Sequence, residues 1–138
     1  MTYESLIERA LEVRKNAYVP YSGFPVGAAL LGSSGSVYTG CNVECASYGG
    51  TNCAERTALF KGVSEGEKSF SAIAVTGDPK AYTFPCGICR QVLVEFGRDL
   101  DVIVARSSTD YQVWKLEQLL PCSFTPEDLN NHQQDGGV

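Results

Sequence analysis

The chain has 138 residues and a net charge of −5, from 11 basic and 16 acidic side chains. This length fits one domain with its own buried core, and no apolar run reaches the roughly 20 residues of a membrane span. The acidic balance argues against a protein that binds phosphate backbones, because such binding depends on clustered Lys and Arg. The mixed, acidic start of the chain is unlike a secretory signal. We therefore expect a cytoplasmic protein with no nucleic-acid and no membrane partner.

The first half of the chain predicts a helix, an antiparallel hairpin and a second helix. Apolar residues recur at helical spacing over residues 3–17, and a loop rich in proline follows. A short apolar run at 26–31 and a returning segment at 37–41, joined by a glycine-serine turn, predict the two strands of the hairpin. An irregular stretch at 42–50 contains a pair of glycines. Residues 51–63 then predict the second helix.

The second half of the chain alternates between strands and helices. The elements we expect are, in order, a strand at 71–75, a helix at 86–96 opened by Pro85, strands at 101–105 and 111–114, and a turn of helix at 116–120. Strands interleaved with helices favour an α/β fold: a three-layer α/β/α sandwich around a mixed, roughly five-stranded sheet. Residues 1–129 form one domain in this prediction. The tail at 130–138 lacks apolar anchors and is predicted to be disordered.

Two short motifs carry the strongest chemical signal, CAE at 53–55 and PCGIC at 85–89. Each falls in the first turn of a predicted helix, where unpaired N–H groups and the helix dipole favour thiolate over thiol. Cys86 and Cys89 are three residues apart, so one helical turn brings both sulfur atoms to the same side. Together with Cys53 they supply three ligands for zinc and leave one tetrahedral position open, which is typical of a catalytic site.

Other interpretations of these cysteines stay open. A fourth cysteine would close the site and make it structural, and Cys41 and Cys45 are the nearest candidates, with Cys122 further away in the sequence. The cysteines can also be small buried apolar residues. Glu55 favours catalysis, because a carboxylate beside a metal can carry protons to and from water. The single histidine, His132, lies in the tail, so the ligand set is expected to be all cysteine.

Three blocks of sequence resemble the small, homotetrameric class of cytidine deaminases. The blocks are YVPYSGFPVGAALL at 18–31, GCNVECASYGGTNCAERTALF at 40–60 and PCGICRQ at 85–91, and the resemblance extends over residues 3–129. It implies a cytidine deaminase-like fold with one Zn²⁺ per subunit. It also implies hydrolytic deamination of cytidine and deoxycytidine in pyrimidine salvage, carried out by a cytoplasmic homotetramer.

The resemblance also implies a role for each site residue. Cys53, Cys86 and Cys89 would bind zinc, and Glu55 would be the proton shuttle. The implied substrate contacts are Phe24 against the base, the backbone of Ala54 at the pyrimidine O2, the Asn42-Val43-Glu44 motif at the 3′-hydroxyl, and Phe124 in the pocket of a neighbouring subunit. One residue departs from the pattern, because Cys45 stands where the family usually has asparagine.

The charge of the centre predicts a role for two arginines. Three thiolates and one Zn²⁺ sum to −1, which would weaken the metal as a Lewis acid. We expect Arg56 and Arg90, next to Glu55 and Cys89, to offset this charge together with the two helix N-termini. Zinc would lower the pKa of water from about 15.7 toward about 7. Glu55 would then take a proton to N3 of cytosine and later to the amino group that leaves.

Three rival functions remain at this point. A polynucleotide deaminase would carry basic and aromatic residues along a strand-binding groove, and the acidic balance counts against it. A blasticidin-type deaminase is a closer relative, but Glu44 favours a plain nucleoside. The chain could also be a zinc-stabilised binding module without catalysis, which loss of activity in Glu55→Gln with zinc retained would exclude.

Overall fold

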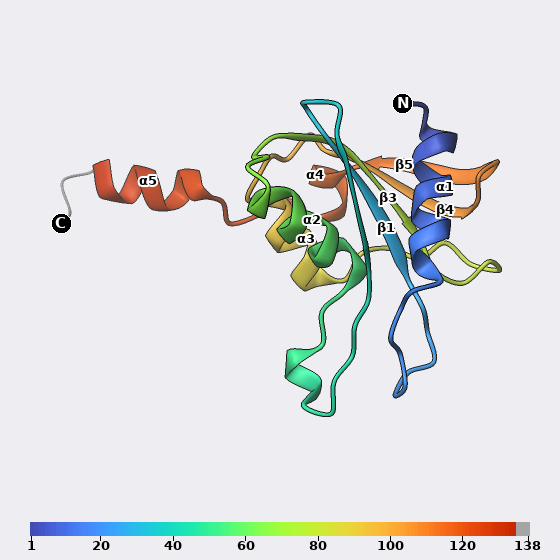
Figure 1. Ribbon diagram of the computed structural model, residues 1–138. Helices are drawn as coiled ribbons and strands as arrows, with labels where there is room; N and C mark the ends of the chain where they lie inside the picture. The colour runs from blue at the N-terminus through green and yellow to red at the C-terminus, as the bar shows by residue number, and fades with distance from the viewer. Residues whose placement is uncertain (135–138) are drawn as a thin grey trace.

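A five-stranded sheet forms the middle of the computed structural model, which describes residues 1–134 and the side chains of residues 1–130 (Figure 1). The strands are β1 (Gly27–Gly32), β2 (Val37–Cys41), β3 (Phe70–Thr76), β4 (Asp101–Ser107) and β5 (Asp110–Lys115). They lie in the order β2-β1-β3-β4-β5. Strands β3 and β4 are parallel, and every other neighbouring pair is antiparallel. The predicted mixed sheet is confirmed.

Helices cover both faces of this sheet. Helix α1 (Tyr3–Arg14) packs on one face, and α2 (Ala54–Ser64) and α3 (Gly87–Val94) pack together on the other. Each face therefore has its own apolar core, as expected for a three-layer α/β/α sandwich. Helix α3 lies in the connection from β3 to β4, because parallel strands need a crossover to join them. A 3₁₀ turn (Tyr48–Gly50) and a short helix α4 (Leu116–Leu119) complete this part of the fold.

The two faces of the sheet carry side chains of different size. Alternate residues of a strand point to opposite faces, so Val102 and Val104 face α2 and α3 whereas Ile103 and Ala105 face α1. Alanines dominate the α1 side of the sheet; they are Ala29, Ala72, Ala74 and Ala105. Small side chains allow a helix to lie close to the sheet. Helix α1 therefore packs close to the sheet.

The close approach of α1 predicts a specific defect in Gly27→Ala. A Cβ atom at Gly27 would lie 2.0 Å from the carbonyl oxygen of Ala10 and 2.9 Å from the backbone nitrogen of Arg14. Backbone atoms cannot rotate away, so α1 would have to shift. We expect a loss of stability of about 1–3 kcal/mol, measured by urea denaturation. Gly49→Ala is the matched control, because a Cβ there meets nothing within 4 Å; equal stability losses in the two variants would contradict the prediction.

Two helix boundaries differ by three residues from those expected. The first helix ends at Arg14 instead of residue 17, and the second begins at Ala54 instead of residue 51. The late start of α2 has a tertiary cause. The backbone of Asn52 pairs with Val43 through two hydrogen bonds of 3.0 Å, which holds residue 52 extended and leaves Cys53 as the N-cap.

The start of the tail also differs from the prediction of disorder. Helix α5 spans Pro126–Gln134 and projects from the body of the protein in Figure 1, so residues 130–134 are helical. Residues next to one another in the sequence favour a helix start here. Pro126 and two acidic residues that follow it lie in the first turn. The N–H of Thr125 also donates a hydrogen bond of 2.8 Å to the Asp128 carboxylate. Residues 135–138 lie outside the described part of the chain. No described helix is both long and apolar enough to span a bilayer.

Candidate metal centre and active site

Three cysteine sulfur atoms meet where the N-termini of α2 and α3 lie side by side. Cys53 is the N-cap of α2, Cys86 is the N-cap of α3, and Cys89 lies in the first turn of α3. All three Sγ atoms lie within 4.8 Å of one another, and those of Cys53 and Cys86 are 3.8 Å apart. The two helices bring together residues separated by more than thirty positions, and one helical turn aligns Cys86 with Cys89, as the spacing predicted.

The cluster fits a zinc ion. A tetrahedral Zn²⁺ with Zn–S bonds of about 2.3 Å places its sulfur ligands about 3.8 Å apart, which matches the separation between Cys53 and Cys86. Among the described residues, no fourth candidate ligand joins this group. Cys45, the departure from the family pattern, directs its Sγ to the carbonyl oxygen of Ser47 at 2.7 Å instead. The described residues therefore form the open, three-ligand type of site used in catalysis and not the closed structural type.

The three thiols do not ionise equally in the protein alone. The pKa of Cys53 is lowered to about 5, first by a hydrogen bond from Cys89 and then by the guanidinium of Arg56 and by Cys86, against the effect of burial. The pKa of Cys89 is raised, because its thiol donates to Cys53 and is buried beside the acidic Glu55. The protein alone thus supports one thiolate readily. A divalent cation supplies the positive charge that allows the remaining thiols to ionise.

Glu55 lies next to the cysteines in the first turn of α2 and is only 4% exposed. Its pKa is raised to about 7, chiefly by burial and further by the nearby Cys53, while its own backbone N–H, Cys89 and Arg56 act in the opposite direction. A carboxyl group that titrates near neutral pH can both accept and release a proton. This property suits a proton shuttle at the floor of the site.

An open cavity of about 220 Å³ lies over this floor. Its wall contains three of the predicted substrate residues, Phe24, Asn42 and Ala54. Sequence reasoning did not single out four other residues of the wall, which are Val26, Thr51, Thr83 and Phe84. The signal that could have found the last two is their position just before the PCGIC motif. None of the described lining residues is Lys or Arg, so the wall offers no cation for a phosphate.

The family model described as the cytidine and deoxycytidylate deaminase zinc-binding region matches residues 1–105. The chain belongs to this family of zinc-dependent deaminases. A cytidine deaminase from Halalkalibacterium halodurans is 52% identical over 132 residues, covering 95% of this chain and all of the relative. Another from Sporosarcina psychrophila is 48% identical over 131 residues, covering 94% of this chain and 96% of the relative.

Solved structures of the family agree with the fold. The crystal structure of cytidine deaminase from Burkholderia pseudomallei superposes with a TM-score of 0.85 at 49% sequence identity, covering 90% of this chain and all of that one. The structure from Mycobacterium tuberculosis superposes with a TM-score of 0.80 at 39% identity, covering 90% of this chain and 98% of that one. The cytidine deaminase-like fold predicted from the sequence is confirmed.

The Asn-x-Glu motif of this deaminase binds the loop that carries Phe24. The amide of Asn42 accepts a hydrogen bond of 2.8 Å from the N–H of Val26 and donates one of 2.9 Å to the carbonyl of Phe24. The Glu44 carboxylate accepts from the N–H groups of Tyr21 and Ser22, each at 3.0 Å, and from the Ser22 hydroxyl. These bonds lower the pKa of Glu44 despite its burial. Both side chains therefore position the aromatic wall of the cavity.

Three substrate residues expected from the resemblance lie outside the wall of the cavity. Glu44 lines an adjacent cavity of about 350 Å³ together with Tyr21, Ser22, Tyr48 and Thr51. The backbone of Val43 is taken up by its pairing with Asn52. Phe124 is 59% exposed, and its carbonyl accepts a hydrogen bond of 2.8 Å from Gln91. Direct substrate contacts by these three residues stay predictions.

The two arginines expected to offset the charge have different partners. The guanidinium of Arg56 donates to the Cys53 sulfur at 3.2 Å, and its Nε is buried without a partner. Arg90 instead donates to the carbonyls of Pro85 and Leu119, each at 2.8 Å. Arg90 thus holds the backbone just before Cys86, and of the two arginines only Arg56 donates to a cysteine sulfur in the described structure. The charge-offsetting role of Arg90 stays a prediction.

Proposed function

We propose that this protein deaminates free cytidine and deoxycytidine by hydrolysis, producing the uridines and ammonia. The observation that carries the proposal is the three-cysteine centre beside the buried carboxyl group of Glu55, at the floor of a cavity walled by Phe24 and Asn42. A proton carrier next to an open metal site is the combination that hydrolysis at an amino-substituted carbon requires. Family membership and relatives named cytidine deaminase point the same way.

Cys53, Cys86 and Cys89 would hold the zinc ion. When bound, zinc makes hydroxide available at neutral pH by acting as a Lewis acid on water. Glu55 takes the proton that water gives up and delivers it to N3 of cytosine, so that hydroxide adds to C4. It next takes the proton of the new hydroxyl group and delivers it to the amino group. The C4–N bond then breaks, ammonia leaves, and a C4 carbonyl remains.

Several residues would bind and orient the nucleoside. Phe24 is 41% exposed at the cavity wall and offers an apolar face for the base. The N–H of Ala54, in the first turn of α2, would donate to the pyrimidine O2. Asn42 lies on the same wall, where its amide can meet the sugar while it holds the Phe24 loop. Glu44 holds the neighbouring loop at Tyr21 and Ser22, and Val43 pairs with the backbone of Asn52.

The substrate range is the test of the proposal. Cytidine and deoxycytidine should lose near-ultraviolet absorbance and release ammonia when mixed with the zinc-loaded protein. Deoxycytidylate and single-stranded RNA should react much more slowly, because the cavity wall carries no basic residue among its described members. Turnover of RNA but not of nucleosides would overturn the proposal in favour of a polynucleotide deaminase. Full zinc with no deamination of any of these compounds would favour a binding module.

Arg56 is expected to support turnover by offsetting thiolate charge. In Arg56→Gln the charge-assisted bond to Cys53 is lost, so the centre becomes more negative and less able to polarise water. We expect kcat to fall by about 10-fold, the effect of losing one hydrogen bond to a charged group, with the fold retained. Steady-state kinetics and circular dichroism measure this. Arg9→Gln, at an exposed position of α1, is the control, and equal kcat values in the two variants would contradict the role of Arg56.

We also propose a cytoplasmic homotetramer that works in pyrimidine salvage. Support for assembly comes from large apolar side chains exposed on the single chain; they include Tyr18, Tyr21, Tyr48, Phe60, Ile88 and Phe124. Exposed apolar surface of this kind is typical of contacts between subunits. Phe124, which lies outside the cavity of its own chain, would then reach the cavity of a neighbour. Light scattering of the purified protein should give the mass of four chains; the mass of one chain would contradict the assembly.

A further inference from the structure

The loop of residues 77–86 connects β3 to α3 and carries part of the active site. Thr83 and Phe84 line the cavity, and Cys86 at the end of the loop belongs to the metal centre. A cavity wall built from a loop needs that loop to be held in one conformation, because each ordered residue costs about 1–2 kcal/mol of conformational entropy. The contacts that hold this loop therefore bear on how well the cavity binds its ligand.

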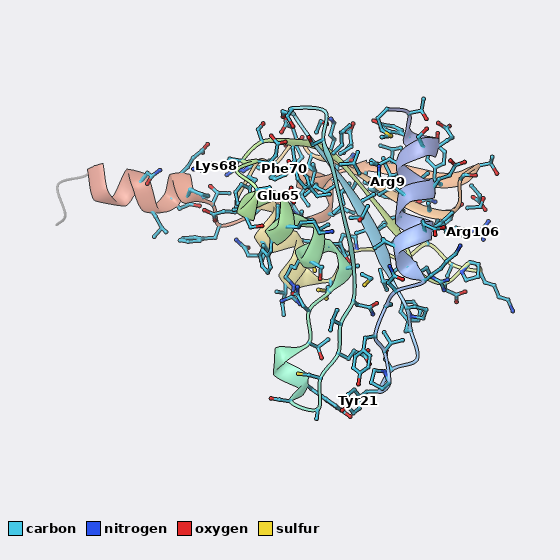
Figure 2. All side chains as sticks on the ribbon, in the orientation of Figure 1. Arg9, Tyr21, Glu65, Lys68, Phe70 and Arg106 are labelled. Atoms are coloured by element: carbon cyan, nitrogen blue, oxygen red, sulfur yellow. The ribbon has the colours of Figure 1, made fainter. Side chains whose placement is uncertain are left out.

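A cluster of three side chains, here called the Tyr82 cluster, joins this loop to the β4–β5 hairpin. The hydroxyl of Tyr82 donates to the Asp110 carboxylate at 2.6 Å, and Nε of Arg106 donates to the other oxygen of the same carboxylate at 2.7 Å. The guanidinium of Arg106 also lies over the ring of Tyr82, 4.8 Å from its centroid. Each member contacts both others, so the geometry of each is set by two partners. Arg106 is labelled in Figure 2.

Further contacts hold other residues of the loop at 77–86 in place. Arg106 donates to the carbonyl of Lys80 at 3.5 Å. The hydroxyl of Thr83 accepts a hydrogen bond of 3.3 Å from Asp78 N–H and packs against Gly77, where a Cβ would lie only 2.3 Å from it. The two cavity residues thus directly follow the anchored Tyr82 in the sequence, and Thr83 contacts Gly77 and Asp78 at the start of the loop.

The second wall residue is bound to the same hairpin. The ring of Phe84 packs edge-on against Trp114 of β5, with centroids 5.9 Å apart and planes at 72°. Trp114 is the single tryptophan of the chain. The loop therefore meets β4 and β5 at two points, the Tyr82 cluster and the Phe84–Trp114 pair, and Thr83 lies between them.

We propose that Tyr82, Asp110 and Arg106 are positioning residues for substrate binding. None of the three lines the cavity; they act through Thr83 and Phe84, whose places in the wall they secure. The inference rests on the proposed deamination of cytidine for its kinetic effect. Loss of the cluster should weaken binding of the nucleoside while leaving Glu55 and the three cysteines in place. The expected signature is a rise in KM with little change in kcat.

Tyr82→Phe tests this with the smallest change, because the ring under Arg106 stays and only the hydroxyl is lost. We expect KM for cytidine to rise by about 3- to 10-fold, the effect of losing one hydrogen bond, with kcat and zinc content close to wild type. Tyr3→Phe is the matched control: it removes a tyrosine–aspartate bond of the same 2.6 Å length, to Asp101 on the α1 side. Asp110→Asn, which weakens both bonds of the cluster, should change KM in the same direction as Tyr82→Phe.

The fluorescence of Trp114 measures the loop without any substrate. Release of Phe84 should change the emission maximum of Trp114 in Tyr82→Phe, whereas Tyr3→Phe should keep the wild-type spectrum. This readout tests the positioning role of the Tyr82 cluster separately from the proposed deamination of cytidine. If the wild type does not deaminate cytidine, the proposed function fails, and an altered spectrum in Tyr82→Phe alone still supports the positioning role. If the wild type is active, unchanged KM and unchanged emission in Tyr82→Phe overturn the role of the cluster. A purely structural role would lower thermal stability in both tyrosine variants without moving KM.

Discussion

Glu55→Gln is expected to lower kcat for cytidine by about 10² to 10⁴-fold, the range of general acid–base catalysis. The amide has nearly the shape of the carboxyl group but can neither accept the proton of water nor pass it to N3. The side chain is buried beside the cysteines, and burial together with the charge of Cys53 raises its pKa to about 7, which suits both halves of the transfer. Absorbance assays on the wild type and the variant, run at equal protein concentration, measure the effect.

Zinc content is the control for this experiment. Glu55 is not one of the three sulfur ligands, so the variant should retain one zinc per chain by elemental analysis. An active variant that retains its zinc would remove Glu55 from the mechanism. An inactive variant that has lost its zinc would instead point to a role in holding the metal. Loss of activity with the metal retained also excludes a binding module without catalysis.

Cys86→Ser should remove most of the zinc and at least about 10²-fold of the activity, because the Lewis acid contributes several kcal/mol to the transition state. Serine is a good N-cap, so α3 should keep the cap that the Cys86 sulfur now provides by accepting from Cys89 N–H at 3.5 Å. The substitution therefore separates loss of the metal ligand from loss of the helix start. Elemental analysis after dialysis and the absorbance assay provide the two readouts.

Cys122→Ser is the matched control for the metal ligand. Cys122 is exposed and does not belong to the three-sulfur group. Its replacement should leave zinc content and activity unchanged. The metal should also stabilise the fold, so wild type should melt at a higher temperature with zinc than after chelation, and Cys86→Ser should show little such difference. Full zinc in Cys86→Ser would show that some other group completes the site.

Local patterns in the sequence determined the elements and the chemistry of the metal centre. Each predicted strand and helix is present, because short apolar runs and helical spacing reflect which side chains must be buried. The same holds for the cysteines. The three-residue gap between Cys86 and Cys89 and the placement of Cys53 and Glu55 at a helix start are properties of a single turn of helix, so they could be predicted without knowledge of the rest of the fold.

Tertiary contacts decided which partners the remaining site residues have. Sugar binding by Asn42 and Glu44 stays a prediction, and the structure adds a second role that sequence spacing did not indicate: their polar atoms hold the loop at residues 21–26. Arg90 lies next to Cys89 in the sequence, but its side chain reaches the carbonyl of Leu119, a residue 29 positions away. The physical reason is that a hydrogen bond depends on distances across the folded chain, which sequence spacing determines only within one element.

The residues of the cavity wall also depend on tertiary contacts and not on local sequence patterns. Thr83 and Phe84 have no distinguishing pattern of their own, and they enter the wall because their loop is bound to the β4–β5 hairpin through Tyr82, Arg106 and Asp110. The sequence by itself determined which chemistry the protein can perform, because ligand type and spacing are local. Only the tertiary structure decided the shape of the site, since packing between distant segments places the side chains that surround that chemistry.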